Sequence, residues 1–268
     1  MIARRFIIII AICATSMLHP YAGRDSAARS RPQLTVLYDN YLGKRGLLSD
    51  NGFSCIIRGT EKTLLFDTGS DKDILLANMR ILDIDPGTID CIVISHDHAD
   101  HTGGLLSILE VNPGITVYLP ERFGDYDLIS KILSYGARTV MVKQPTAICK
   151  GVFATGVIGE KGLFEQSLVI NSKSGLVLLC GCAHPGITNI VEANIRIFNK
   201  PVVFVFGGFH SQSASQTRMM ETIKKLASYG VFGVGGSHCT EDEMRQLLQA
   251  FYGKNYVPMG VGGTITLR

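Results

Sequence analysis

Five apolar, β-branched segments of this chain end in a polar turn that contains aspartate, histidine or glycine. These segments are Leu64–Phe66, Ile92–Ile94, Leu176–Leu179, Val202–Phe206 and Val231–Val234. Short apolar runs of this kind are typical of buried strands. Strand ends that lie on one side of a sheet face a common crevice, where α/β proteins place their ligands. The pattern therefore predicts sheets with a polar, ligand-binding crevice at the strand ends.

The remaining apolar periodicity predicts further strands and a set of helices. The predicted strands are Gln33–Tyr38, Phe53–Arg58, Thr63–Phe66, Cys91–Ser95, Thr116–Leu119, Thr139–Val142, Ser167–Asn171, Leu176–Cys180, Val202–Phe206, Val231–Val234 and Thr264–Leu267. The predicted helices are Ile74–Leu82, Gly103–Leu109, Asp125–Tyr135, Ile187–Phe198, Ser215–Tyr229 and Glu241–Phe251. Hairpin-like strands come first and strand–helix alternation follows, which predicts an α+β protein whose sheets are covered by helices.

The first residues of the chain have the pattern of a secretory signal. Arg4 and Arg5 precede the apolar run Phe6–Cys13, and small residues follow it. The run is shorter than the roughly 20 residues of a membrane-spanning helix, and a buried N-terminal strand is the alternative. We predict a signal peptide at residues 1–22. The protein is then exported, periplasmic or secreted, with no stable membrane span after the signal is removed.

Charge and cysteine content restrict the partners and the crosslinks. The formal net charge is +3, which is too small to indicate a polyanionic partner, so no nucleic acid is expected. The oligomeric state is not indicated. Six cysteines follow the signal, and most lie in or beside apolar, strand-like runs, where free cysteine packs as a small hydrophobe. No disulfide framework is predicted.

All histidines beyond the predicted signal follow predicted strands. One histidine in such a place is usually an ordinary polar residue of a core or surface, but six in equivalent positions indicate a metal site. They are His96, His98, His101, His184, His210 and His238.

The first three of these histidines have a specific spacing. His96 and His98 alternate on an extended turn, so both rings reach one side. Asp100 and His101 continue round the bend, where they can serve a second ion. Neutral imidazole and carboxylate are ligands that zinc, iron and manganese accept. A polar loop that is histidine-rich by chance is the alternative to this two-metal site.

The run Ser95–Gly104 resembles the signature of the metallo-β-lactamase superfamily, and Leu64–Gly69 looks like that family's first motif. The resemblance implies a metallo-β-lactamase-like αββα sandwich over residues 33–268, with two mixed sheets flanked by helices. It also implies that Asp67 supports the site by orienting a histidine through its other ring nitrogen.

Later segments are similar to one branch of the superfamily, typified by 7,8-dihydropterin-6-methyl-4-(β-D-ribofuranosyl)aminobenzene-5′-phosphate synthase-like proteins. These segments are Glu165–Ser167, Gly181–Gly186, Gly207–His210 and Ser237–Thr240. Many superfamily members have a metal-bridging aspartate in a Gly-Asp pair where this chain has Gly181-Cys182. Either Cys182 is a thiolate ligand, or His184 is the ligand and water alone bridges the ions. We favour His184, because an exported thiol is open to oxidation.

The sequence therefore predicts two divalent metal ions. Zinc is the expected metal, and manganese and iron are the alternatives. His96, His98 and a later histidine, foremost His184, would hold one ion, and Asp100, His101 and His238 or His210 the other. A metal-bound hydroxide would attack a small ester, phosphoester or lactone-type substrate, with Asp100 as the catalytic residue that assists proton transfer. The alternatives are a di-metal redox enzyme and a non-catalytic metal-binding domain.

Overall fold

The computed structural model describes residues 31–160, 162 and 164–267. The predicted signal at residues 1–22 lies outside this part of the chain. Among the described residues, no helix has both the length and the apolar character needed to cross a membrane.

The first sheet has seven strands in the order β13-β1-β2-β3-β4-β5-β6. Its strands are β1 (Gln33–Tyr38), β2 (Ser54–Arg58), β3 (Leu64–Phe66), β4 (Cys91–Val93), β5 (Thr116–Pro120), β6 (Arg138–Val142) and β13 (Thr264–Thr266). Pairing is antiparallel from β13 to β3 and parallel from β3 to β6. The sheet is therefore mixed, as predicted.

The second sheet has six strands in the order β12-β11-β10-β9-β8-β7. Its strands are β7 (Thr146–Cys149), β8 (Val152–Ala154), β9 (Leu168–Asn171), β10 (Leu176–Cys180), β11 (Val202–Gly208) and β12 (Gly233–Ser237). Strands β10, β11 and β12 are parallel, and β7 to β10 are antiparallel. Strands β9 and β10, expected at Ser167–Asn171 and Leu176–Cys180, form an antiparallel hairpin.

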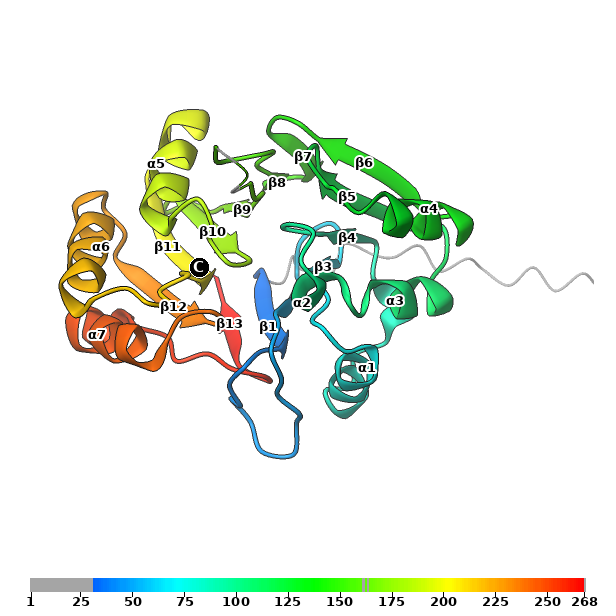
Figure 1. Ribbon diagram of the computed structural model, residues 1–268, viewed down its shortest axis with the longest axis horizontal. Coiled ribbons are helices and arrows are strands. Elements are labelled where there is room, and N and C mark those ends of the chain that lie inside the picture. Colours follow the sequence, from blue (N-terminus) through cyan, green and yellow to red (C-terminus); the bar gives the residue numbers. More distant parts are fainter. Residues whose placement is uncertain (1–30, 161, 163, 268) are drawn as a thin grey trace, which may run out of the picture.

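Helices cover the outer face of each sheet (Figure 1). The first sheet is covered by α1 (Lys72–Ile81), α3 (Leu105–Val111) and α4 (Tyr126–Ser134), and the second by α5 (Ile187–Phe198), α6 (Gln216–Ser228) and α7 (Asp242–Tyr252). The short elements are α2 (Ala99–Thr102) and the 3-10 turns η1 (Pro86–Thr88) and η2 (Gly253–Asn255). The predicted αββα arrangement is thus confirmed.

Period-2 alternation along the strands builds three apolar layers. In β3, Leu64 and Phe66 enter the core between the two sheets, while Leu65 packs under the helices of the first sheet. In β10, Val177 and Leu179 point into the central core, and Leu178 packs against α5, α6 and α7. Because both faces of these strands are buried, they have continuous apolar sequences.

Two elements lie elsewhere than predicted, and one hairpin was not predicted. The strand expected at Val231–Val234 lies at Gly233–Ser237. This segment pairs in parallel with β11, but its sequence is rich in glycine and therefore resembles a turn. A side chain at Gly235 would lie 2.8 Å from the Phe206 ring, so this strand needs glycine where it packs. The hairpin β7–β8 was not predicted, and the helix expected at Gly103–Leu109 begins only at Leu105.

Candidate metal centre

The two sheets present their strand ends to one crevice. Backbone contacts hold α2, which follows β4 there: Thr68 donates from N and Oγ1 to His101 O, at 2.8 and 2.9 Å. The Phe53 N–H also donates to Asp100 O, at 3.1 Å. The turn after β3 and the residue directly before β2 therefore fix the helix that carries Asp100 and His101.

Three histidine rings meet at the end of β4. His96 Nε2 lies 3.1 Å from His98 Nδ1 and 3.1 Å from His184 Nε2. The other ring nitrogen of His96, Nδ1, lies 2.8 Å from Ser95 Oγ. With Nδ1 engaged by the hydroxyl, Nε2 is free to act as a metal ligand.

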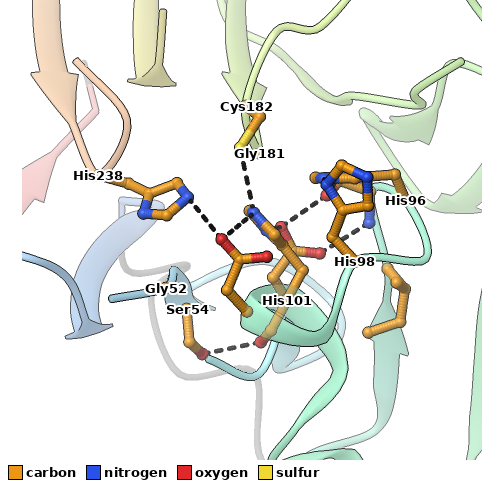
Figure 2. Close-up of polar contacts among 12 residues, drawn as sticks. Gly52, Ser54, His96, His98, His101, Gly181, Cys182 and His238 are labelled. Carbon is orange, nitrogen blue, oxygen red and sulfur yellow. Dashed lines mark hydrogen bonds and ion pairs between the residues drawn. The ribbon is translucent and has the colours of Figure 1, made fainter. Parts of the chain in front are cut away.

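A second group of ligand atoms adjoins the first. Asp100 Oδ2 lies 3.4 Å from His238 Nε2 and 3.9 Å from His101 Nε2. The outer nitrogens of both rings are engaged by oxygen, since His101 Nδ1 lies 2.7 Å from Asp67 Oδ2 and His238 Nδ1 lies 2.8 Å from Asn40 Oδ1. Figure 2 shows Cys182 pointing toward the ring of His101, with His238 to one side of that ring.

The donor atoms of both groups fit metal ions. Within each group the three potential ligand atoms lie within 4.8 Å of one another. His238 Nε2 is buried and makes no hydrogen bond of good geometry with any described residue. Uncharged ring nitrogens that converge through their lone pairs repel one another, and a bound cation removes that repulsion. Sets of His₃ and Asp/His₂ are ordinary sites for zinc, iron or manganese.

The electrostatic surroundings keep three of the rings in the form that binds metal. Burial, together with neighbouring histidines, holds the pKa of His96 and of His101 well below the usual value. Burial and the nearby His210 lower the pKa of His184 to about 4. Burial opposes ionisation of Asp100, but the adjacent His238 and His101 rings hold its pKa below the usual range. His96, His101 and His184 are therefore neutral imidazoles beside the Asp100 carboxylate. Burial disfavours the charged form of His238, but the contact with Asp100 outweighs burial and raises the pKa of His238.

Asp67 contacts both segments that carry the proposed ligands, at Ser95 and at His101. This carboxylate is buried, and its Oδ1 accepts from Ser95 N at 2.7 Å. Its Oδ2 accepts from Ser95 Oγ at 2.8 Å and contacts His101 Nδ1. The sequence predicted that Asp67 orients a histidine, and the contact identifies that histidine as His101.

Cys182 and His184 both reach the crevice, although the sequence presented them as alternatives. Cys182 Sγ lies 3.2 Å from His101 Nε2 and forms a converging group with His96 and His101. Ala183 between them has a φ of 61°, a left-handed conformation that returns the chain toward the site. Cys182 therefore lies beside ligand atoms of both groups.

His210 lies beside the site rather than within either group. Its ring centroid is 4.5 Å from that of His184, and its side chain is exposed. Among the described residues, it joins none of the converging sets of ligand atoms. The strand-end pattern correctly predicted that His210 lies at the crevice, but such a pattern does not predict the direction of its ring.

Several polar residues of the site were missed by the sequence analysis. Asn51 Nδ2 donates to Asp100 Oδ2 at 3.4 Å, and Asn40 contacts His238. Both come from the β1–β2 loop, which is remote in sequence and carries no motif. Glu165 was noted only as part of a family segment; it is fully buried, and burial raises its pKa to about 8.

Comparisons with known proteins agree with this architecture. The family description "Metallo-beta-lactamase superfamily" matches residues 49–138. The 7,8-dihydropterin-6-methyl-4-(beta-D-ribofuranosyl)-aminobenzene-5′-phosphate synthase of Methanocaldococcus jannaschii is 30% identical, over 87% of this chain and 96% of that protein.

Solved structures show the same fold. Tm1679, described as a metal-dependent hydrolase of the β-lactamase superfamily, is 27% identical with a TM-score of 0.73, covering 88% of this chain and 99% of that one. The metallo-β-lactamase fold protein YhfI from Bacillus subtilis shares the fold at 13% identity, with a TM-score of 0.62 over 87% of this chain and 99% of its own. The chain belongs to the metallo-β-lactamase superfamily, on the branch of the M. jannaschii synthase.

Proposed function

We propose that this protein is a two-metal hydrolase that acts on a small ester, phosphoester or lactone-type substrate. Zinc is the expected metal, with manganese and iron as the alternatives. One observation carries the proposal, namely two adjoining groups of ligand atoms at the crevice. These groups are His96, His98 and His184, and Asp100, His101 and His238.

A metal pair held by these groups would supply an activated water as the nucleophile and polarise the scissile bond. Asp100 is suited to proton transfer, because its side chain is 24% exposed while the rings beside it are buried. Its Oδ2 accepts from the Asn51 amide, which restricts the rotation of the carboxylate. We therefore assign Asp100 a second role, in which the carboxylate would accept the proton released by the attacking water and pass it to the leaving group.

Cys182 is the proposed counterpart of the bridging aspartate. Its thiol lies beside His101 and converges with His96, which belong to different groups. Thiolate is a soft ligand that suits zinc or iron better than magnesium, calcium or manganese. This placement favours zinc or iron over manganese.

The substrate class follows from the site and from the relatives. The name of the M. jannaschii relative contains a 5′-phosphate, and this favours a phosphoester among the three substrate types. We do not extend its synthase activity to this chain. The signal proposed at residues 1–22 would export the protein, and an exported enzyme is badly placed for intracellular pterin synthesis.

The test is a screen of phosphoesters, lactones and β-lactams with protein reconstituted with zinc, manganese or iron. We expect metal-dependent hydrolysis that falls sharply in Asp100→Asn. Stoichiometric iron with an optical band and reduction of a small molecule would instead indicate a redox enzyme. Stoichiometric metal with no turnover on any substrate would indicate a metal-binding domain, and either result would overturn the proposal.

A further inference from the structure

Glu165 is a buried carboxylate whose hydrogen bonds all reach one loop. Its Oε1 accepts from Gly181 N at 2.8 Å and from Cys182 N at 3.1 Å. Its Oε2 accepts from His184 N at 3.1 Å. Both oxygens are thus engaged by the backbone of the segment that carries Cys182 and His184.

That loop needs an external partner for its amides. It follows β10, and the left-handed Ala183 interrupts regular pairing after Cys180. Gly181 leaves no room for a side chain, because a Cβ there would lie 2.2 Å from Ser95 Oγ. Buried N–H groups without acceptors are costly, so the carboxylate determines the path of this loop.

The next residue, Gln166, holds the other side of the site. Its N–H donates to Ser95 O at 2.9 Å, and its Nε2 donates to Ile94 O at 2.7 Å and to Tyr118 O at 3.2 Å. Ile94 and Ser95 lead directly into His96. Two adjacent residues therefore tie the turn after β4, in the first sheet, to the loop after β10, in the second.

We propose that Glu165 is a positioning residue, which fixes Cys182 and His184 at the distance from His96 that a metal ion requires. Gln166 holds the turn after β4, which leads into His96, in place on the opposite sheet. The inference rests on the proposed metal centre but not on hydrolysis, because it concerns where the ligands lie.

The decisive variant is Glu165→Gln, which keeps the shape of the side chain. An amide has one acceptor oxygen, so its NH₂ group must face either His184 N–H or the pair Gly181 and Cys182 N–H. We expect Zn²⁺ to bind about 10–100-fold more weakly at the His184 site. Competition with a chromophoric chelator measures both steps of Zn²⁺ binding. In the Co²⁺-loaded protein, we also expect a shift in the sulfur-to-cobalt band from Cys182.

Asn112→Asp is the matched control for a loss of stability alone. Asn112 Nδ2 donates to Pro86 O and Ile89 O, at the end of α3 and far from the crevice. Asn112→Asp also keeps the shape of the side chain, but a carboxylate cannot donate these two hydrogen bonds. The variant should therefore have a lower melting temperature and unchanged Zn²⁺ affinities at both steps. If Glu165→Gln does not fold, Glu165→Asp, which keeps both oxygens but has a shorter reach, takes its place in the same titration.

Wild-type affinities at both steps in the Glu165 variant would overturn the inference, whatever the melting temperature. The same titration decides the role of Glu165 in a protein that binds Zn²⁺ but hydrolyses nothing. Loss of the proposed function is therefore distinguishable from loss of this inference.

Discussion

Replacing Asp67 by asparagine should weaken metal binding without removing any proposed ligand. The carboxylate Oδ2 now contacts His101 Nδ1 at 2.7 Å and accepts from Ser95 Oγ. This contact holds the ring proton on Nδ1 and leaves His101 Nε2 as a lone pair facing the site. In Asp67→Asn, Oδ1 can still accept from Ser95 N, which places the NH₂ group against His101 Nδ1.

Two donors then face each other, and the His101 ring must move its proton to Nε2 or rotate. Either change removes the lone pair that would bind the second ion. Changes to residues that orient a ligand typically weaken metal affinity about 10–100-fold, which corresponds to about 1.4–2.7 kcal/mol. Because Asp67 is completely buried, no water can enter at low cost to restore the lost acceptor.

Zn²⁺ titration of the metal-free protein measures this change. We expect Zn²⁺ binding at the group of Asp100, His101 and His238 to weaken more in Asp67→Asn than binding at the group of His96, His98 and His184. Asp85→Asn is the control, because Asp85 is exposed and accepts only locally, from Gly87 N at 2.8 Å. If Asp67→Asn bound both ions as the wild type does, the ring-orientation argument would be refuted.

Three further predictions concern the same crevice. Cys182→Ala should abolish the sulfur-to-cobalt absorption band of Co²⁺-loaded protein, whereas a retained band would exclude Cys182 as a ligand. Gly181→Ala should destabilise the fold by about 1–3 kcal/mol, because the added methyl would lie 2.2 Å from Ser95 Oγ; an unchanged urea midpoint would contradict this. In the metal-free protein, the contribution of His184 to the free energy of unfolding should fall as the pH is lowered from 6.5 to about 4. Over that range the unfolded chain protonates His184 while the folded state keeps it neutral, so at this residue the unfolded state binds more protons. Urea unfolding of the wild type and His184→Gln at about pH 7 and about pH 5 isolates this contribution, and the same difference between the two proteins at both pH values would contradict it.

The sheet strands were predictable where both of their faces are buried. Segments such as Leu176–Cys180 are continuously apolar because one face packs between the sheets and the other under helices. Strand β12 was misplaced because its packing against the Phe206 ring requires glycine, which in sequence indicates a turn. Local propensity cannot reveal a requirement that a neighbouring strand imposes.

The candidate site was predictable in its histidines and less so in its supporting residues. Spacing along the chain placed His96, His98 and His101 together, and the strand-end pattern brought in His184 and His238. The contacts of Glu165 with the loop after β10 depend on how the two sheets pack. No spacing within the sequence encodes such a contact, so only the structure revealed it.

The central claim, that this crevice holds two metal ions, is tested most directly by anomalous diffraction from crystals of the zinc-loaded protein. We predict two peaks at the zinc edge. One should lie among His96, His98 and His184, and the other among Asp100, His101 and His238. Data from His96→Ala, His98→Ala crystals should lack the first peak. The absence of any zinc peak in the wild-type crevice, or zinc bound only elsewhere, would contradict the account.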